Sequence, residues 1–515
     1  MPPYAPRVFH WLRSRLYHPP APETSRLIVG STGSGKSEGE MVELVRLADR
    51  AAAAIVLLDG HGPLAFRTAG HWVARGHTAR VVYEPLHRTD RVLCWNMLPR
   101  STAADPSQRL LEDAETRDEL AQCFLVQRNL ATLNDRPLTK EWLEAAITLC
   151  LLQPDAEPLT SLPAAFRVGS PEYERLLRDC AHPETIARFR DLERLRRRNE
   201  VQYEIQTGAA RRLLDIVCGS EVVRLRARPG PFDWGQALRD RRLIAFDGGG
   251  IRSREIKRTL FLLAGMQIVH AVRREFAETQ APLPVVLVLE EAGALGLVTP
   301  FVLSALQELR KAGLAIHLIT QSSLDFGDPA LFESVLANTP SLAWYQSLSP
   351  ADQELGAKVL ANATFDAHEI HYTRTRQVRA GVEPVVTESH GETRNPHGHV
   401  LLRSSRKSAT LLSQYREADE SYFKSPQLHE QEYRTALATL RIGERFARDR
   451  RDVRRGRVRP LRPPRPRAGF EERTRAAIEQ IRLQPIYLPP PPAPVVTEVP
   501  LADAAERLRG QGEDS

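Results

Sequence analysis

The sequence has few cysteines, and none stands in a pair that would suggest a metal or redox site. Its 515 residues include five cysteines, which are scattered and odd in number. None has the C-x-x-C spacing of zinc and thiol-redox motifs. The pattern excludes a cysteine-based zinc site and a disulfide framework, and it indicates reduced thiols in a cytoplasmic protein.

Long apolar runs are also missing. No run approaches the ~18 residues that a membrane-spanning helix needs. The apolar run at 51–58 ends at Asp59, and the run at 285–289 ends at Glu290. Residues 1–25 lack the apolar centre of a secretory signal. We therefore expect a solvated leader over 1–25 and no intrinsic membrane span.

The positive charge is concentrated near the carboxyl end. The net charge of the chain is +7, whereas the stretch 441–470 alone contains twelve Arg and three acidic residues. Four consecutive prolines follow at 489–492. This composition is typical of a disordered or extended segment, so we expect a basic, flexible Arg/Pro-rich tail over 431–515. The arginines suit binding to a phosphate backbone. The alternative that they are simply solvated stays open, both for this tail and for the basic run at 193–198.

The octapeptide at 30–37 has the pattern G-x-x-x-x-G-K-S. It follows the apolar run 27–29 and precedes apolar residues at helical spacing, the context of a phosphate-binding P-loop. Its glycines let backbone N–H groups face phosphate oxygens, and the helix N-terminus favours negative charge. Lys36 is expected at the β- and γ-phosphates and Ser37 at Mg²⁺. The expected ATP-binding residues of the loop are Gly30, Ser31, Thr32, Gly33, Ser34, Gly35, Lys36 and Ser37.

Strand-like apolar runs alternate with helical patterns around this loop. The runs lie at 54–58, 79–83, 243–247, 285–289 and 315–319. Such alternation predicts a mostly parallel, doubly wound α/β sheet, in which ligands gather at the carboxyl ends of the strands. Asp59 is therefore expected at the nucleotide. For His61 the spacing leaves a simple turn histidine equally open.

An acidic pair, Glu290 and Glu291, ends the run at 285–289. Together with a P-loop upstream, this is the Walker B pattern. The first carboxylate lies near Mg²⁺, and the second polarises the attacking water. Glu290 stands where Asp is usual, so the geometry at Mg²⁺ is an open point.

Two further polar residues stand near the strand expected at 315–319. Gln321 follows this strand and is placed to contact a γ-phosphate. Arg310 lies eleven residues earlier, at the end of a helical pattern. It is either a surface cation or an arginine finger that reaches the ATP of a neighbouring copy.

Residues 101–233 have helical spacing of Leu, Ala, Glu and Arg without strand signals. We expect this segment to be an all-α domain inserted into the nucleotide-binding domain. The latter then comprises 26–100 and 234–430.

In its motifs the chain resembles the FtsK–HerA superfamily of P-loop ATPases, and within it the conjugative coupling proteins of type IV secretion, the TraG/TraD kind. The helical insertion favours the coupling proteins over the HerA-like members of the superfamily. One position departs from their pattern, since Met97 replaces the proline of their N-P-L motif. The matched motifs are G-S-T-G-S-G-K-S at 30–37, L-L-D-G-H-G at 57–62, W-N-M-L at 95–98, L-E-E-A-G at 289–293, L-R-K-A-G-L at 309–314, T-Q-S at 320–322 and L-A-N-T at 336–339.

The resemblance implies a RecA-like core that assembles as a homo-oligomeric ring, usually a hexamer, with ATP between subunits and DNA in the channel. It also implies a role for each matched residue. Lys36 and Ser37 bind phosphate and Mg²⁺, and Glu290 binds the metal. Glu291 is the catalytic base, Arg310 is an arginine finger that acts on a neighbouring copy, and Gln321 is the sensor.

The function that these residues favour is an ATP-driven DNA-translocating motor, a coupling protein for conjugative transfer with a relaxase and secretion-channel components as partners. Recruitment to the inner membrane would then occur through those partners. Two alternatives stay open. One is a HerA-like DNA-processing or defence ATPase or helicase. The other is an adaptor that binds ATP with little hydrolysis, which the Glu at position 290 favours.

Overall fold

The computed structural model describes residues 24–101, 105–126, 137–364, 370–394, 398, 400–423, 425–449, 452–458 and 469–491. The leader expected at 1–25 lies almost wholly outside the described residues, as does the end of the expected tail after 491. The chain divides into two compact units, one of 1–352 with 440–515 and one of 353–439. Among the described residues, no helix combines 18 residues of length with the hydropathy that a bilayer span needs.

The first unit is built on a nine-stranded sheet in the order β12-β11-β8-β1-β7-β6-β2-β5-β3. Seven neighbouring strands, from β8 to β3, are parallel. The strands are β1 (Arg26–Val29), β2 (Ala54–Asp59), β3 (Val81–Pro85), β5 (Leu243–Asp247), β6 (Val285–Leu289), β7 (Leu314–Thr320), β8 (Ser341–Tyr345), β11 (Glu444–Asp449) and β12 (Asp452–Arg457). Nearly every residue of the parallel strands is buried, as expected when helices cover both faces. The predicted doubly wound α/β fold is confirmed.

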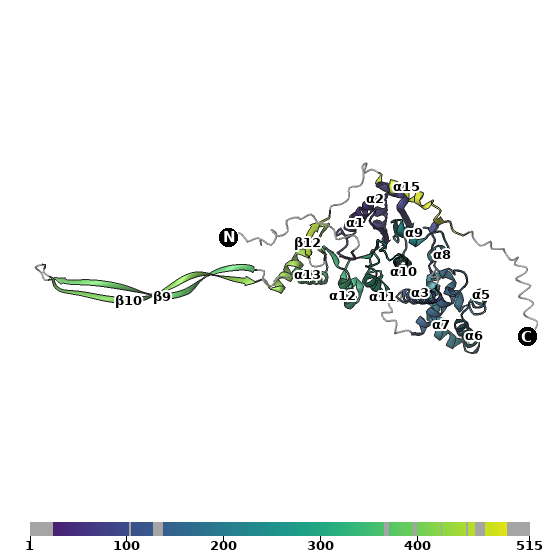
Figure 1. The fold of residues 1–515 in the computed structure, drawn as a ribbon, viewed down its shortest axis with the longest axis horizontal. Coiled ribbons are helices and arrows are strands. Elements are labelled where there is room, and N and C mark those ends of the chain that lie inside the picture. The colour runs from purple at the N-terminus through teal and green to yellow at the C-terminus, as the bar shows by residue number, and fades with distance from the viewer. Residues whose placement is uncertain are drawn as a thin grey trace, which may run out of the picture. The chain divides into compact units, whose positions relative to one another are not determined.

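Helices connect the parallel strands, because a parallel crossover needs a long connection. Figure 1 shows them around the sheet. They are α1 (Lys36–Arg50), α2 (Pro63–Ala74), α9 (Trp234–Arg239), α10 (Arg254–Thr279), α11 (Pro300–Glu308) and α12 (Pro329–Asn338). The chain leaves each strand at the same edge of the sheet, so residues distant in sequence meet there.

A helical segment lies between β4 (Val92–Leu93) and β5. It comprises α3 (Pro106–Val126), α4 (Pro137–Leu151), η4 (Leu159–Phe166), α5 (Pro171–Asp179), α6 (Pro183–Arg198), α7 (Glu200–Cys218) and α8 (Glu221–Arg226). The described part of this segment contains no strand between β4 and β5. An aromatic cluster of Trp142, Phe166 and Phe189, with ring centroids 6.0–6.3 Å apart, fills its centre. The segment predicted at 101–233 is therefore helical in its described part, and it lies within the first compact unit.

The expectation of a flexible tail from residue 431 needs correction. Strand β11 pairs antiparallel with β8 and β12 pairs with β11, while α15 (Phe470–Arg482) packs on α2 and β13 (Tyr487–Leu488) pairs with β4. Two arginines of this region are buried with acidic partners, Arg445 and Arg482. Arg445 is 3% exposed, and its guanidinium lies 3.4 Å from Glu43 and 3.0 Å from the hydroxyl of Tyr345. Composition shows the arginines but not the acids that pair with them.

The second unit contains a long β-hairpin that the sequence did not predict. The unit comprises most of α13 (Pro350–Thr364), the hairpin strands β9 (Ile370–Arg394) and β10 (Val400–Phe423), and α14 (Pro426–Ala438). From the sequence we expect only an irregular, weakly β-like region over 373–404. Instead β9 and β10 pair antiparallel from Ile370–Phe423 to Arg394–Val400. The separate unit 353–439 also differs from the expected single domain continuing to 430.

The buried Arg445–Glu43 pair predicts that β11 stabilises the first unit. Replacing Arg445 with Ala leaves the buried Glu43 carboxylate without this cation, which we expect to cost ~3 kcal/mol. The exposed Arg457 of β12 is the matched control, and its replacement with Ala is expected to change stability by less than about 0.5 kcal/mol. Urea-denaturation midpoints measure both. Equal midpoints for the two variants would contradict a stabilising role for the Arg445–Glu43 pair.

Candidate nucleotide-binding site

The loop at 30–37 connects β1 to α1 at the carboxyl edge of the sheet. Gly33 and Gly35 have φ of 79° and 91°, a left-handed backbone that glycine adopts without a steric penalty. A Cβ on Gly30 would lie 2.6 Å from the Cβ of Tyr345, so this position also requires glycine. The loop backbone therefore has the conformation that the motif predicts.

Neighbouring loops hold the P-loop from two sides. The amide of Ser31 donates to the carbonyl of Gln346 at 2.9 Å, just after β8. The amide of Gly443 donates to the carbonyl of Ser34 at 2.9 Å, just before β11. Gly443 is a site residue that the sequence analysis missed, and no local signal marks it because its partner lies about 400 residues away.

The helix after the loop is anchored by a buried group of charges. Glu40 on α1 accepts a 2.5 Å hydrogen bond from the His317 ring of β7 and lies 3.5 Å from Arg26 of β1. Burial of Glu40 opposes its ionisation. His317 and Arg26 nevertheless lower the pKa of Glu40 to about 2. The carboxylate thus fixes α1 to two neighbouring strands through most of the pH range.

Glu290 meets the P-loop serine. Its Oε1 accepts a 2.8 Å hydrogen bond from the Ser37 hydroxyl. Burial and then the carboxylate of Asp59 raise the pKa of Glu290 to about 8, although Ser37 and Lys36 oppose this. Among the described residues, Glu290 Oε2 and the Ser34 hydroxyl are buried with no hydrogen-bond partner. Two buried polar atoms without partners, one on the P-loop and one on Glu290, fit a site that a ligand completes.

Lys36 is a buried cation that faces three carboxylates. The residue is 7% exposed, and burial lowers the pKa of its amine. Glu291, Glu290 and Asp325 oppose this shift. Asp325 is a second residue that the sequence analysis missed. A signal was present, since Ser322 and Asp325 form the S-x-x-D capping box that begins η5 (Ser323–Phe326).

Glu291, Gln321 and Thr32 form a chain of hydrogen bonds across the site. The Gln321 amide donates to Glu291 Oε1 at 2.7 Å, and its oxygen accepts from the Thr32 hydroxyl at 2.7 Å. His61 Nε2 lies 3.4 Å from the same Glu291 oxygen. Glu291 also has a φ of 58°, which is rare for a residue with a side chain. The structure thus brings Gln321, Glu291 and the P-loop together and adds His61 to them.

Asp59 lies at the site, but its carboxylate is occupied by the backbone. One oxygen accepts from the His61 amide and the other from the Ala65 amide, each at 2.9 Å. The side chain is 0% exposed, and burial raises its pKa. Asp59 therefore orders the turn into α2 and affects Glu290 through its charge, and its contact with the nucleotide stays a prediction.

Arg310 is not brought to the site of its own chain. It is exposed in the turn between α11 and β7, which places it at the amino end of β7. Because β7 runs parallel to β1, this end lies at the opposite edge of the sheet from the P-loop.

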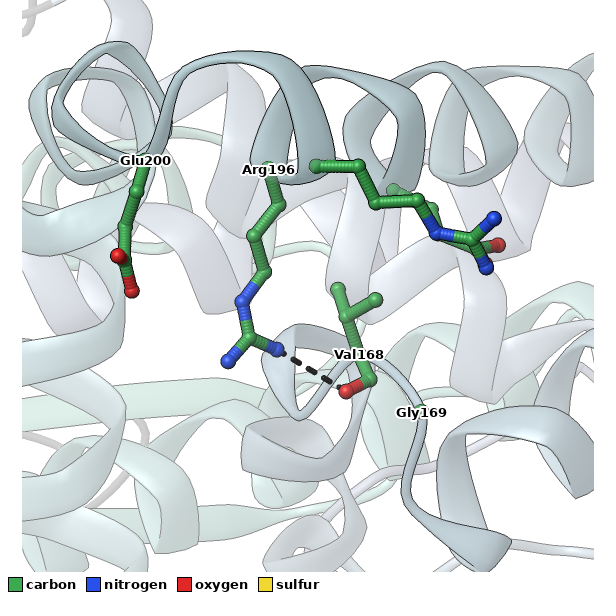
Figure 2. Close-up of a pocket in the computed structure, with 6 residues that line it drawn as sticks. Val168, Gly169, Arg196 and Glu200 are labelled. Carbon is green, nitrogen blue, oxygen red and sulfur yellow. Dashed lines mark hydrogen bonds and ion pairs between the residues drawn. The ribbon is translucent and has the colours of Figure 1, made fainter. Parts of the chain in front are cut away.

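The basic run at 193–198 is largely engaged in local contacts of the helical insertion. Glu193 pairs with Arg190 at 2.8 Å and also with Arg197. Arg196 donates to the carbonyl of Val168 at 3.0 Å beside a hollow on α6, as Figure 2 shows. Arg194, Arg196, Arg197 and Arg198 are nevertheless exposed, so the run forms a solvated helix face with local contacts.

Comparisons with known proteins identify the fold. No protein-family model matches the sequence, and no curated protein sequence matches it significantly. Among solved structures, the unbound bacterial conjugative coupling protein TrwBdeltaN70 matches over 88% of this chain and 88% of its own, with 14% identity and a TM-score of 0.50.

Two other solved structures match less well. The plasmid coupling protein TrwB in complex with ADP and Mg²⁺ has 13% identity over 91% of this chain and 88% of its own, with a TM-score of 0.49. VirB4 of Thermoanaerobacter pseudethanolicus has 13% identity over 85% and 89%, with a TM-score of 0.47. The chain has the fold of a bacterial conjugative coupling protein, which confirms the predicted resemblance at the level of fold.

Proposed function

We propose that this protein is an ATPase that binds ATP with Mg²⁺ and uses hydrolysis to move DNA, as a coupling protein for conjugative transfer. The observation that carries the proposal is the meeting of Ser37 and Glu290, 253 residues apart, with an unpartnered buried oxygen left on Glu290. Phosphate-binding glycines, a buried lysine and a buried carboxylate pair are the components of nucleotide hydrolysis.

Ser37 and Glu290 would hold Mg²⁺, which prefers hydroxyl and carboxylate oxygens. The free Glu290 Oε2 fits this role, since it is buried without a partner among the described residues. When bound, the ion neutralises charge on the phosphates. Lys36 adds a second positive charge on the same side, and its burial strengthens its interaction with an anionic substrate.

Glu291 is placed to act as the general base that orients a water and accepts its proton. Gln321 links this base to Thr32 of the P-loop. A γ-phosphate that replaced Glu291 or Thr32 as the hydrogen-bond partner of Gln321 would change the position of the Glu291 carboxylate. Gln321 can therefore report the state of the nucleotide to the rest of the chain, as a sensor does.

Arg310 completes the site of a neighbouring copy in this proposal. It lies at the edge of the sheet opposite its own P-loop, where it can act only on another chain. Active sites shared between copies require a homo-oligomer, and repetition of one such contact closes a ring; we propose a hexamer. DNA in the ring, a relaxase and secretion-channel components are the proposed partners, which the motif resemblance to coupling proteins implies.

The raised pKa of Glu290 favours a second candidate, an adaptor that binds ATP but hydrolyses little. A carboxyl group with a pKa of about 8 is largely protonated at neutral pH, which weakens its affinity for a metal ion. Turnover measurements separate the two candidates.

For a DNA-dependent ATPase, loss of the base or of the P-loop lysine abolishes turnover. We expect Lys36→Ala and Glu291→Gln each to lower the ATPase rate by roughly 100-fold or more. Exposed Lys358 gives the control variant Lys358→Ala, which should leave the rate unchanged. Phosphate release is measured with and without DNA. An unchanged rate in Glu291→Gln would establish the adaptor, and a rate in the wild type that DNA does not raise would contradict the motor.

Arg310 and Lys311 are adjacent, and both are exposed, so they give a matched pair of variants. We expect Arg310→Ala to lose turnover by roughly 100-fold or more while still binding ATP, because a finger acts on the transition state. Lys311→Ala should retain turnover. Mixing Arg310→Ala with Glu291→Gln should restore part of the activity, since some interfaces then combine an intact base with an intact finger. No recovery on mixing would contradict action between copies.

The pKa of Glu290 predicts how Mg²⁺ affinity depends on pH. The carboxylate form binds the ion, and this form is scarce below a pKa of about 8. Affinity should therefore rise as pH increases toward 8, by roughly tenfold per unit at the steepest, and level off above it. Glu290→Gln should remove the dependence. Titration of Mg²⁺ against bound fluorescent nucleotide between about pH 6 and pH 9 measures this; a flat wild-type profile would contradict it.

A further inference from the structure

The hairpin of β9 and β10, here called the arm, is a ribbon of two very long strands. The strands have 25 and 24 residues, so at ~3.3 Å per residue each is roughly 80 Å long. Figure 1 shows them as one twisted two-stranded ribbon. Among the described residues, no third strand joins this sheet. Each strand therefore has one outer edge at which alternate backbone N–H and C=O groups lack a ladder partner.

The outer half of the arm is exposed on both faces. Every side chain that the structure describes between 383 and 410 is exposed, including Val385 and Val386 at 41% and 57%. Two-stranded ribbons are at best marginally stable in water, and proteins usually protect long edges with proline, lysine or bulges. Pro384 is the only proline in either strand. On β9, residues 385–394 contain no proline or lysine, and the register shift in this part of the arm lies next to the turn, between Val400 and Leu402 of β10. The arm is therefore suited to pairing with another strand.

Charge is divided between the two edges of the arm. In the outer half of the arm, β9 carries three Glu and one Arg over 383–394, while β10 carries two Arg and one Lys and no acid over 400–414. In the inner half the signs are reversed, with three Arg and no acid over 370–382 of β9 and three acids and one Arg over 415–423 of β10. The charged residues of the outer half are Glu383, Glu388, Glu392, Arg394, Arg403, Arg406 and Lys407. Within one arm Lys407 pairs with Glu388, and Arg403 lies 2.8 Å from Glu392. In the outer half of the arm, the β9 edge is therefore acidic and the β10 edge is basic.

We propose that the arms of neighbouring copies pair edge to edge, β9 of one copy with β10 of the next. When two arms are related by a rotation and point the same way, β9 of one runs antiparallel to β10 of the other, as inside each arm. In the outer half, every acidic β9 segment then has a basic β10 segment on both sides. Pairing β9 with β9 would place glutamates together, and pairing β10 with β10 would place the cations together, both of which are unfavourable.

Repetition of this contact around a ring closes an antiparallel barrel with two strands from each copy. A contact between two different edges is heterologous, and heterologous contacts close into rings. Closure removes the free edges, which is how β-barrels protect themselves from uncontrolled pairing. The partner of each free edge of the arm is thus the arm of another copy. This pairing rests on the proposed ring but does not require ATP hydrolysis.

Cross-linking between two single-cysteine populations tests this. Thr387 on β9 and Ser408 on β10 are opposite each other in one arm, and the five native cysteines are buried. Full-length Thr387→Cys and Ser408→Cys chains carry one reactive thiol each, so a short bismaleimide joins them only across copies. We expect the mixed product to exceed either homodimer by roughly tenfold. The cross-linking is measured in chains that also carry Lys36→Ala. These chains are expected to lack ATPase turnover, so arm pairing is tested independently of ATP hydrolysis.

Charge-reversal variants test the same contact between arms in a second way, in case an introduced cysteine distorts the strand. Glu388→Lys with Glu392→Lys should lower the mixed product, and adding Arg403→Glu with Lys407→Glu to the same chain should restore it, because the edges are complementary again. Homodimers as abundant as the mixed product would overturn the proposal in favour of like-edge pairing. No product between copies would overturn it in favour of another occupant, such as a strand of a channel protein.

Discussion

A single hydrogen bond, from the hydroxyl of Ser37 to the carboxylate of Glu290, depends on nearly everything else in the first unit. It joins the start of α1 to the end of β6, and these approach only because β1, β7 and β6 are adjacent and parallel. The apolar strands supply the burial that holds this register. The same burial raises the pKa of Glu290. Fold and site chemistry therefore share one physical cause.

Much of this site could be predicted from the sequence because its motifs are local. A glycine-rich loop between a strand and a helix determines its own backbone, and an acidic pair after an apolar run must lie at the carboxyl edge. Asp59 shows the limit of such reasoning. Its position was predicted correctly, but its oxygens bind the amides of His61 and Ala65, and only the geometry of the turn shows which donor reaches them first.

Residues 441–458 and the arm were predicted poorly for two different physical reasons. Arginine-rich sequence normally stays in water, and the burial of Arg445 follows from Glu43 and Tyr345, which lie in distant segments. Every side chain described in the outer half of the arm is exposed, so this part of its strands lacks the alternation that marks a half-buried sheet. Its structure follows from pairing between two polar strands, which depends on register and not on hydrophobic pattern.

The contact between Ser34 and Gly443 has a consequence for biosynthesis. The phosphate loop is among the first structured parts to leave the ribosome, yet one of its two supports is made about 410 residues later. At ~5–20 residues per second this delay is roughly 20–80 s. A nascent chain therefore carries an unfinished loop for most of its synthesis and acquires a complete one only near release. A chain truncated before β11 would lack the support however well its remaining domains folded.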